Sequence, residues 1–229
     1  MKKIIAAIML AAVLGSNAYA ADFHDIGSHW AQNTIRRLAA MGVVNGVSAT
    51  EFNPDGMVTR AEYLKMIMNL VGMGTAEWRE GECLDAKRTD WYAVFLQSAL
   101  DKGLIPKEMI ASYRVSIKSE TAADGSVTER AVYTGAFNGE LPITREEMAV
   151  LTMHIYQYML DSTTASTLKA GIKVNLYDME SISVWAQPSV RLAVAQGFIE
   201  GMEDGKFHPE DTATRAQAAT IMGRIIDNK

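Results

Sequence analysis

Apolar residues recur along this chain at the spacing of one helix face, in pairs of segments. In the first segment of each pair, they fall at intervals of three and then one residue. This spacing predicts a helix with one buried stripe, and the glycine that follows each stripe favours the end of that helix. The stripes with their glycines are Ile35, Leu38, Ala39 and Gly42; Leu96, Ala99, Leu100 and Gly103; Val190, Ala193, Val194 and Gly197.

The second segment of each pair opens with threonine and arginine, and has glutamate or glutamine three residues after the threonine. This is the capping-box pattern, in which two side chains satisfy two backbone N–H groups at a helix start. Apolar residues then recur with a period close to 3.5, which predicts a second helix with one buried face. The three openings read Thr59-Arg60-Ala61-Glu62, Thr144-Arg145-Glu146-Glu147 and Thr214-Arg215-Ala216-Gln217.

The paired segments belong to three copies of one unit. Each copy has an acid before a tryptophan, and the interval from tryptophan to glycine is the same in all three. One copy alone cannot bury its apolar faces, so stacked repeats are expected. We therefore predict a mostly α fold with pseudo-threefold symmetry, in which the three second helices form a central bundle and the first helices surround it.

The middle copy carries an insertion of 24 residues. Within it, two runs of alternating apolar and polar residues flank Asp124-Gly125, which predicts a small β-hairpin. Because loops tolerate insertions, we place this hairpin, near residues 107–142, on the surface. The apolar positions of the two runs are Tyr113, Val115 and Ile117, and Val127, Ala131 and Tyr133.

The N-terminus has the order of a secretory signal peptide: two lysines, an apolar run over residues 4–14, and Ala18-Tyr19-Ala20. The run is too short to span a bilayer, and no other stretch is long enough, so we expect a secreted protein without a membrane span. The expected divisions are a signal peptide over 1–20, repeat one over 22–72, repeat two over 82–160, a linker over 161–174 and repeat three over 175–229.

The composition of the chain excludes several classes of function. Hydrophobic residues make up 48% of the 229 residues and charged residues 21%, which is typical of a folded chain. The net charge of −5 argues against a nucleic-acid partner. A single cysteine, Cys83, excludes an internal disulfide framework, and the four histidines lack metal-ligand spacing. We therefore expect neither a metal nor a cofactor.

The repeat resembles the S-layer homology domain. The shared pattern comprises Phe23-His24-Asp25, Trp30-Ala31, Phe52-Asn53-Pro54 and Thr59-Arg60-Ala61-Glu62, and repeat one matches it most closely. The resemblance implies a three-armed helical module that attaches exported bacterial proteins non-covalently to cell-wall carbohydrate. The implied partner is a pyruvylated secondary wall polymer in many Gram-positive organisms and modified peptidoglycan in some diderm relatives, and the implied location is the cell wall or S-layer.

The helix starts themselves suit an acidic sugar. A helix N-terminus favours anions, and arginine at the first helical position adds a planar fork for a carboxylate such as that of a pyruvate ketal. Tryptophan could stack on a sugar ring, aspartate could accept sugar hydroxyls, and glycine could allow close approach. The candidate ligand-binding residues are Asp25, Trp30, Gly46, Arg60, Asp85, Trp91, Arg145, Asp178, Trp185, Gly201 and Arg215.

Each residue type also has a structural interpretation. The tryptophans could pack one repeat against another, the aspartates could cap the following turn, and the arginines could pair with a neighbouring acid. Glu62, Glu147 and Gln217 favour capping over ligand contact.

Three functions remain open at this level. Non-catalytic anchoring to the wall leads, and three grooves on one polymer would add avidity. A protein–protein scaffold of the envelope is the second, with the 107–142 insert contacting an envelope protein. A wall hydrolase is the third, since paired carboxylates such as Asp25 and Glu62 are available, although similar acids in all copies indicate an architectural role.

Overall fold

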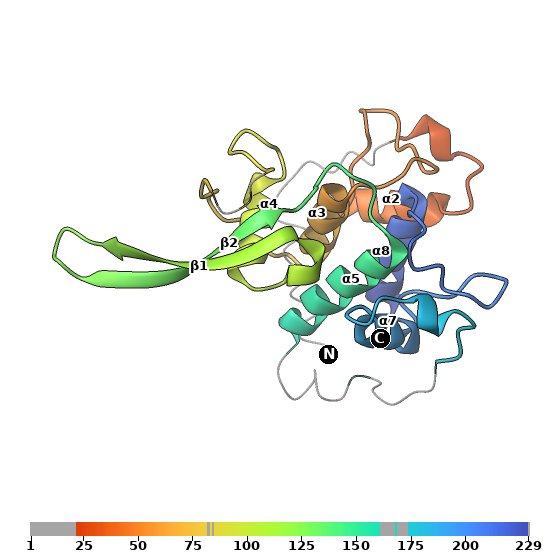
Figure 1. Ribbon diagram of the computed structural model, residues 1–229. Coiled ribbons are helices and arrows are strands. Elements are labelled where there is room, and N and C mark those ends of the chain that lie inside the picture. The colour runs from red at the N-terminus through yellow and green to blue at the C-terminus, as the bar shows by residue number, and fades with distance from the viewer. Residues whose placement is uncertain (1–21, 82, 84, 161–167, 169–173, 229) are drawn as a thin grey trace. The chain divides into compact units, whose positions relative to one another are not determined.

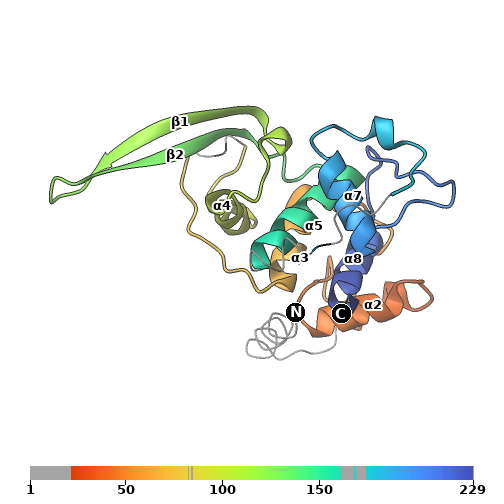
Figure 2. The same cartoon turned by 90° about the horizontal axis from the view of Figure 1, so that it is seen from below.

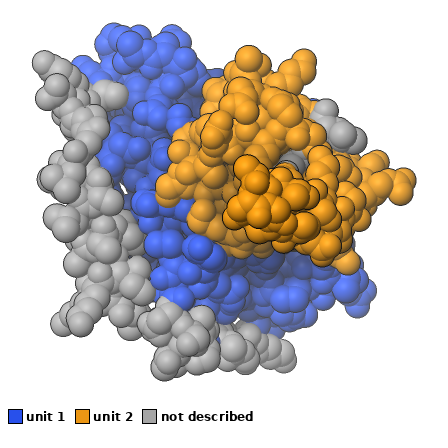
Figure 3. Space-filling view, turned by 90° about the vertical axis from the view of Figure 1, so that its left-hand side faces the viewer, with its two compact units in different colours: residues 1–73, 141–229 blue, residues 74–140 orange. Residues whose placement is uncertain are grey.

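The computed structural model describes residues 22–81, 83, 85–160, 168 and 174–228. It divides into two compact units, residues 1–73 with 141–229, and residues 74–140 (Figure 3). The predicted signal peptide and most of the predicted linker lie outside the described residues. The elements are η1 (His24–Ile26), α2 (Gln32–Ala40), α3 (Arg60–Leu70), α4 (Ala93–Asp101), η2 (Lys107–Met109), β1 (Ala111–Thr121), β2 (Val127–Ala136), α5 (Arg145–Met159), η3 (Met179–Ser181), α7 (Gln187–Gln196) and α8 (Arg215–Asp227).

Three helices of the first unit, α3, α5 and α8, begin with complete capping boxes. In α3 the Thr59 hydroxyl accepts from the Glu62 N–H at 3.2 Å, and the Glu62 carboxylate accepts from the Thr59 N–H at 2.9 Å. In α8, Gln217 takes the position of Glu62, and its Oε1 accepts from the Thr214 N–H at 3.0 Å. The predicted helix starts are thus confirmed, each at its arginine.

The predicted central bundle is also confirmed. Helix α3 contacts both α5 and α8, while α2 packs on α8 and α7 packs on α5 (Figures 1 and 2). Since α2 belongs to repeat one and α8 to repeat three, the first helix of one repeat covers the second helix of another. The apolar stripe that the sequence predicts is therefore buried only when the repeats assemble.

A ring of three backbone hydrogen bonds joins the segments before the bundle helices. The Val58 N–H donates to the Ala213 carbonyl at 3.0 Å, the Ala213 N–H donates to Ile143 at 3.2 Å, and the Ile143 N–H donates to Val58 at 3.0 Å. All three residues are fully buried. Each repeat gives one hydrogen bond and receives one, which is the pseudo-threefold symmetry expressed in the backbone.

The second unit contains α4 and the predicted hairpin, so the two helices of repeat two fall in different units. Strands β1 and β2 are antiparallel, and their register pairs Val115 with Tyr133 and Thr121 with Val127. Between them the Asp124 side chain accepts from the Ser126 N–H, and Gly125 takes a positive φ of 82°. Val115 and Val127 are more than half exposed, as a surface insertion predicts.

Close contact between α2 and α8 depends on Gly223, where a Cβ would lie 2.7 Å from Thr34 Cγ2 and 3.2 Å from Arg37 Nη2. We expect Gly223→Val to lower the free energy of unfolding by about 1–3 kcal/mol, because the added methyl groups overpack this interface. Urea denaturation followed by circular dichroism measures the change. Adding Thr34→Ala should recover part of the loss; an equal loss in both backgrounds would show that this contact is not the cause.

Candidate functional site

The arginine that opens each bundle helix is buried, with 5–6% of its surface exposed. Arg215 of repeat three packs against repeat one. Its Nε donates to the Phe52 carbonyl at 2.8 Å and its Nη2 donates to the Asn45 carbonyl at 2.7 Å. Its guanidinium carbon lies 4.7 Å from the centre of the Phe52 ring. The helix start is therefore fixed to a loop of a different repeat.

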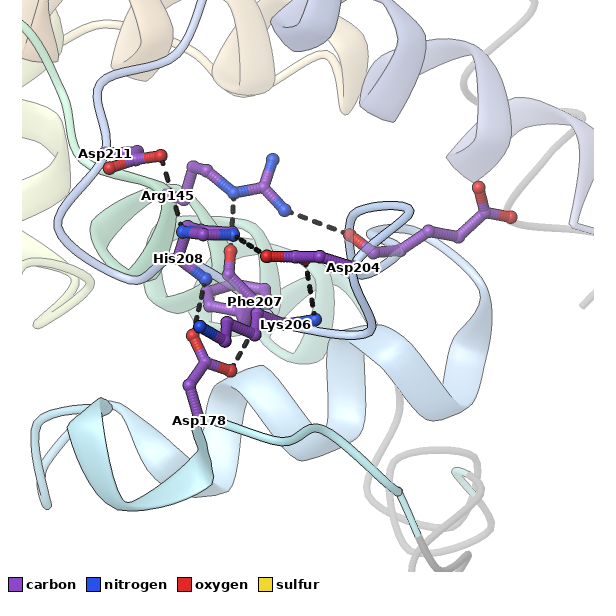
Figure 4. Close-up of polar contacts among 8 residues, drawn as sticks. Arg145, Asp178, Asp204, Lys206, Phe207, His208 and Asp211 are labelled. Carbon is purple, nitrogen blue, oxygen red and sulfur yellow. Dashed lines mark hydrogen bonds and ion pairs between the residues drawn. The ribbon is translucent and has the colours of Figure 1, made fainter.

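Arg145 makes the same contacts with repeat three. Its Nε donates to the Phe207 carbonyl at 2.8 Å, its Nη2 donates to the Glu200 carbonyl at 3.0 Å, and its guanidinium carbon lies 5.0 Å from the centre of the Phe207 ring (Figure 4). Phe207 and Glu200 occupy the positions in repeat three that Phe52 and Asn45 occupy in repeat one. Two of the three guanidinium nitrogens are thus used in the same way in both copies.

The third nitrogen distinguishes the arginines. Arg215 Nη1 donates to Glu62 Oε1 at 2.7 Å, and Arg60 Nη1 forms an ion pair with Glu147 Oε1. For these two arginines, the ion-pair interpretation of the sequence is therefore realised. Arg145 has no ion pair among the described residues, because the position equivalent to Glu62 is Gln217. Figure 4 shows its third nitrogen directed away from both carbonyls.

Burial also changes the acidity of these groups. Desolvation lowers the pKa of Arg145, and the negative charges of Asp211 and Asp178 oppose that shift. Desolvation likewise lowers the pKa of Arg215, against the opposing effect of Glu62 and Asp25. Because arginine starts from so high a pKa, both remain cationic at neutral pH.

A groove of about 160 Å³ lies over Arg145. All three repeats contribute to it: Trp30 from repeat one, Arg145 from repeat two, and Gly201 with the α8 residues Gln217 and Arg224 from repeat three. Trp30 is 66% exposed, so its ring is available to a ligand. Ile199, Glu200, Met202, Thr220 and Ile221 complete the lining.

Arg224 was not among the residues that the sequence singled out. It lies seven residues after Gln217 in α8, two helical turns along the same face, and its Nη2 donates to Glu200 Oε2 at 2.6 Å. The sequence signal that could have identified Arg224 is its position on the same helix face as Gln217. The groove therefore contains two arginines, of which Arg224 is paired with a largely exposed carboxylate.

The three aspartates have a structural task in this fold. The Asp25 carboxylate accepts from the backbone N–H groups of Phe52, at 3.0 Å, and Asn53, at 2.6 Å. Asp85 binds the N–H groups of residues 137 and 138 in the same way, and Asp178 those of residues 207 and 208 (Figure 4). The prediction that they cap the following turn is wrong in its detail, because each clamps a distant loop: 27–30 residues along the chain for Asp25 and Asp178, and 52–53 residues for Asp85.

The clamped loops share a strained conformation. Asn53, Asn138 and His208 each have a φ of 55–57°, in the left-handed region that most residues avoid. Two N–H groups bound to one carboxylate hold the backbone there. In repeats one and three this loop also presents the carbonyl and the aromatic ring on which the arginine lies.

The remaining candidates differ from one another. Trp91 is 46% exposed, with its ring 5.5 Å from that of Tyr92, while Trp185 is half-buried. At Gly46 a Cβ would lie 2.5 Å from the Phe23 ring and 2.4 Å from a backbone carbonyl, so this glycine serves internal packing. Among the predicted residues, the structure brings Trp30, Arg145 and Gly201 together in one groove.

Comparison with known proteins agrees with this architecture. The family model of the S-layer homology domain matches residues 22–64 and 176–219, which make up most of repeats one and three. The fold and the groove define the class of this protein: a helical module of three repeats, in which each bundle helix starts with a threonine–arginine capping box. The chain therefore contains S-layer homology domains in these two regions.

Relatives include both enzymes and surface proteins. An amylopullulanase of Thermoanaerobacterium thermosulfurigenes is 31% identical over 91% of this chain, and the exoglucanase XynX of Acetivibrio thermocellus is 32% identical over 90%. An S-layer protein of Bacillus thuringiensis subsp. finitimus is 25% identical over 97%. The matches span 10%, 16% and 24% of these three relatives, so the chain corresponds to a small part of each.

The S-layer homology domains confirm two expectations: they imply a cell-wall anchoring module, and they support a secreted location associated with the cell wall. Within the described part of the chain, no helix combines the length and apolar character that crossing a membrane requires.

The Asp25 clamp predicts a pH-dependent contribution to stability. Burial raises the pKa of Asp25, but its backbone hydrogen bonds outweigh that effect and leave the pKa below the usual value. The ionised form therefore stabilises the fold above the unfolded-state pKa, and this contribution is lost as the pH falls through the folded-state pKa. We expect Asp25→Asn to cost about 1 kcal/mol at pH 7.

The test is urea denaturation of wild type and Asp25→Asn between pH 7 and pH 3. The difference between them should stay constant down to about pH 5 and shrink below about pH 4. Asp22→Asn, which removes an exposed charge three residues away, is the control and should show little difference. A gap for Asp25→Asn that persists unchanged at pH 3 would overturn the ionic clamp.

Proposed function

We propose that this chain holds an exported protein on the cell wall by binding an acidic, carboxylate-bearing glycan in the Arg145 groove. The observation that carries the proposal is the third guanidinium nitrogen of Arg145, a buried cation without an ion pair among the described residues, beside an open groove. A buried charge that lacks a counter-ion is costly, and an incoming carboxylate would offset that cost. A pyruvylated wall polymer, or a modified peptidoglycan, supplies such a group.

Trp30 supports a sugar as the rest of the ligand. An exposed indole ring at the edge of a cationic groove offers an apolar face to a sugar ring while the carboxylate points inward. The N-terminus of α5, which begins at Arg145 itself, adds a favourable potential for the anion. Position, charge and shape therefore favour one ligand class.

Catalysis has less support than binding. The carboxylates that suggest a hydrolase are engaged elsewhere: Asp25 holds a loop, Glu62 is shared between its capping box and Arg215, and Glu200 pairs with Arg224. A glycosidase needs an acid and a second carboxylate facing the substrate. The glycosidase relatives match this chain over a small share of their length, which is consistent with a shared non-catalytic module.

The scaffold alternative rests on the hairpin. Val115, Ile117 and Val127 are 52–63% exposed on β1 and β2, where they form a stripe of exposed apolar side chains. Contact with an envelope protein through the 107–142 insert remains a prediction that depends on this stripe alone.

Binding to purified wall sacculi, measured by cosedimentation, tests the proposed function. Trp30→Ala should weaken binding about fivefold or more, because it removes an exposed aromatic contact. Arg224→Ala should weaken it as well, because Glu200 then stands unpaired and repels an acidic glycan. Raising the salt concentration should reduce the binding of wild type.

Tyr158→Ala is the matched control, since Tyr158 is 51% exposed at the other end of α5 and should not affect binding. Variants of Trp30 and Arg224 that sediment as well as wild type would exclude the groove as the wall-binding site.

A further inference from the structure

We propose that Gln217 makes the Arg145 groove the carboxylate-receiving groove of the first unit, and that its side-chain amide donates to the ligand together with Arg145. The same position is glutamate in the other two repeats, where it supplies an internal carboxylate to an arginine. This inference rests on the proposed function for the identity of the glycan, but the role of Gln217 can be tested separately.

The capping box fixes the orientation of the Gln217 amide. Its Oε1 accepts from the Thr214 N–H at 3.0 Å, so the other terminal atom is the amide nitrogen, which only donates. In Glu62 the equivalent pair of atoms is two acceptors: Oε2 takes the Thr59 N–H at 2.9 Å and Oε1 takes Arg215 Nη1 at 2.7 Å. A donor at this position cannot bind an arginine.

Replacing the acceptor by a donor reverses what the groove can receive. Around Arg215, the Glu62 carboxylate occupies the third guanidinium nitrogen, and Glu147 does the same for Arg60. Over Arg145, a guanidinium N–H and an amide N–H remain, and both residues line the same groove. Two donors beside one cavity suit a carboxylate, which has acceptor sites on both oxygens.

The internal pairs indicate the ligand chemistry. Glu62 places a carboxylate against Arg215, whose guanidinium is otherwise held like that of Arg145, by one aromatic ring and two backbone carbonyls. An external carboxylate beside Gln217 would supply Arg145 with the acceptor that Glu62 supplies to Arg215. The ketal-linked pyruvate of a wall glycan carries such a group at the end of a short, rigid attachment.

The decisive variant is Gln217→Glu, which keeps the capping box and restores the internal carboxylate. Calorimetric titration would use two probes: pyruvate ion, and a pyruvylated wall-polysaccharide fragment with the same fragment after acid removal of the ketal as its reference. We expect wild type to bind both carboxylate probes at one site. We expect Gln217→Glu to bind them about tenfold to a hundredfold more weakly and to melt at a higher temperature, because Arg145 then has an ion pair.

Glu62→Gln is the reciprocal variant. Gln217 shows that glutamine caps a bundle helix in this fold, so α3 should still form. Removing the Glu62 carboxylate should release Arg215 Nη1 and raise the stoichiometry for pyruvate ion from one to two. Gln157→Glu, on the exposed end of α5, is the control for adding a negative charge and should leave binding unchanged.

The outcomes separate the two claims. If wild type binds pyruvate ion at one site and Gln217→Glu does not, but neither binds the glycan fragment, the role of Gln217 stands and the proposed function falls. If wild type binds the glycan fragment and Gln217→Glu binds it equally well, wall binding stands and the role of Gln217 is wrong. Binding of pyruvate ion at no site, or unchanged by Gln217→Glu, overturns the inference.

Discussion

The first unit depends on a cyclic exchange in which every bundle helix starts on another repeat. Three buried backbone hydrogen bonds close this exchange into a ring, and the arginines just after the ring reach across to the neighbouring loops. Because backbone groups buried away from water must be paired, no repeat can leave the ring without exposing or orphaning such groups. The bundle and the Arg145 groove of the first unit both depend on this geometry.

The arginines show how the ring determines electrostatics. A guanidinium taken out of water needs hydrogen-bond acceptors on all its nitrogens. Backbone carbonyls and an aromatic ring satisfy most of Arg215 and Arg145 in the same way, and a glutamate completes Arg215. Arg145 lacks that last partner among the described residues. The proposed binding site therefore lies where the internal ion pair of the other two repeats is missing.

Local sequence patterns were sufficient for the helices and the hairpin, because capping boxes, apolar stripes and Asp-Gly turns act over a few residues. They were insufficient for the site. Glu62 and Arg215 are 153 residues apart in the chain, and Asp25 binds backbone groups 27 and 28 residues away. Neither pairing leaves a periodic signal, so the sequence singled out these residues but left their roles open between ligand contact and structure.

The sequence also could not show which residues of the three repeats share a groove. Repeat one matches the family pattern most closely, yet the groove takes Trp30 from repeat one, Gln217 from repeat three and, from repeat two, Arg145, which has no ion pair in the described part of the chain. Three identical grooves would hold a polymer by avidity, each one contributing weakly. With internal carboxylates on Arg60 and Arg215, the proposed retention depends on the strength of a single site. Burying the cation before the ligand arrives serves that purpose, since a desolvated, preorganised arginine binds a carboxylate more strongly than a hydrated one on the surface.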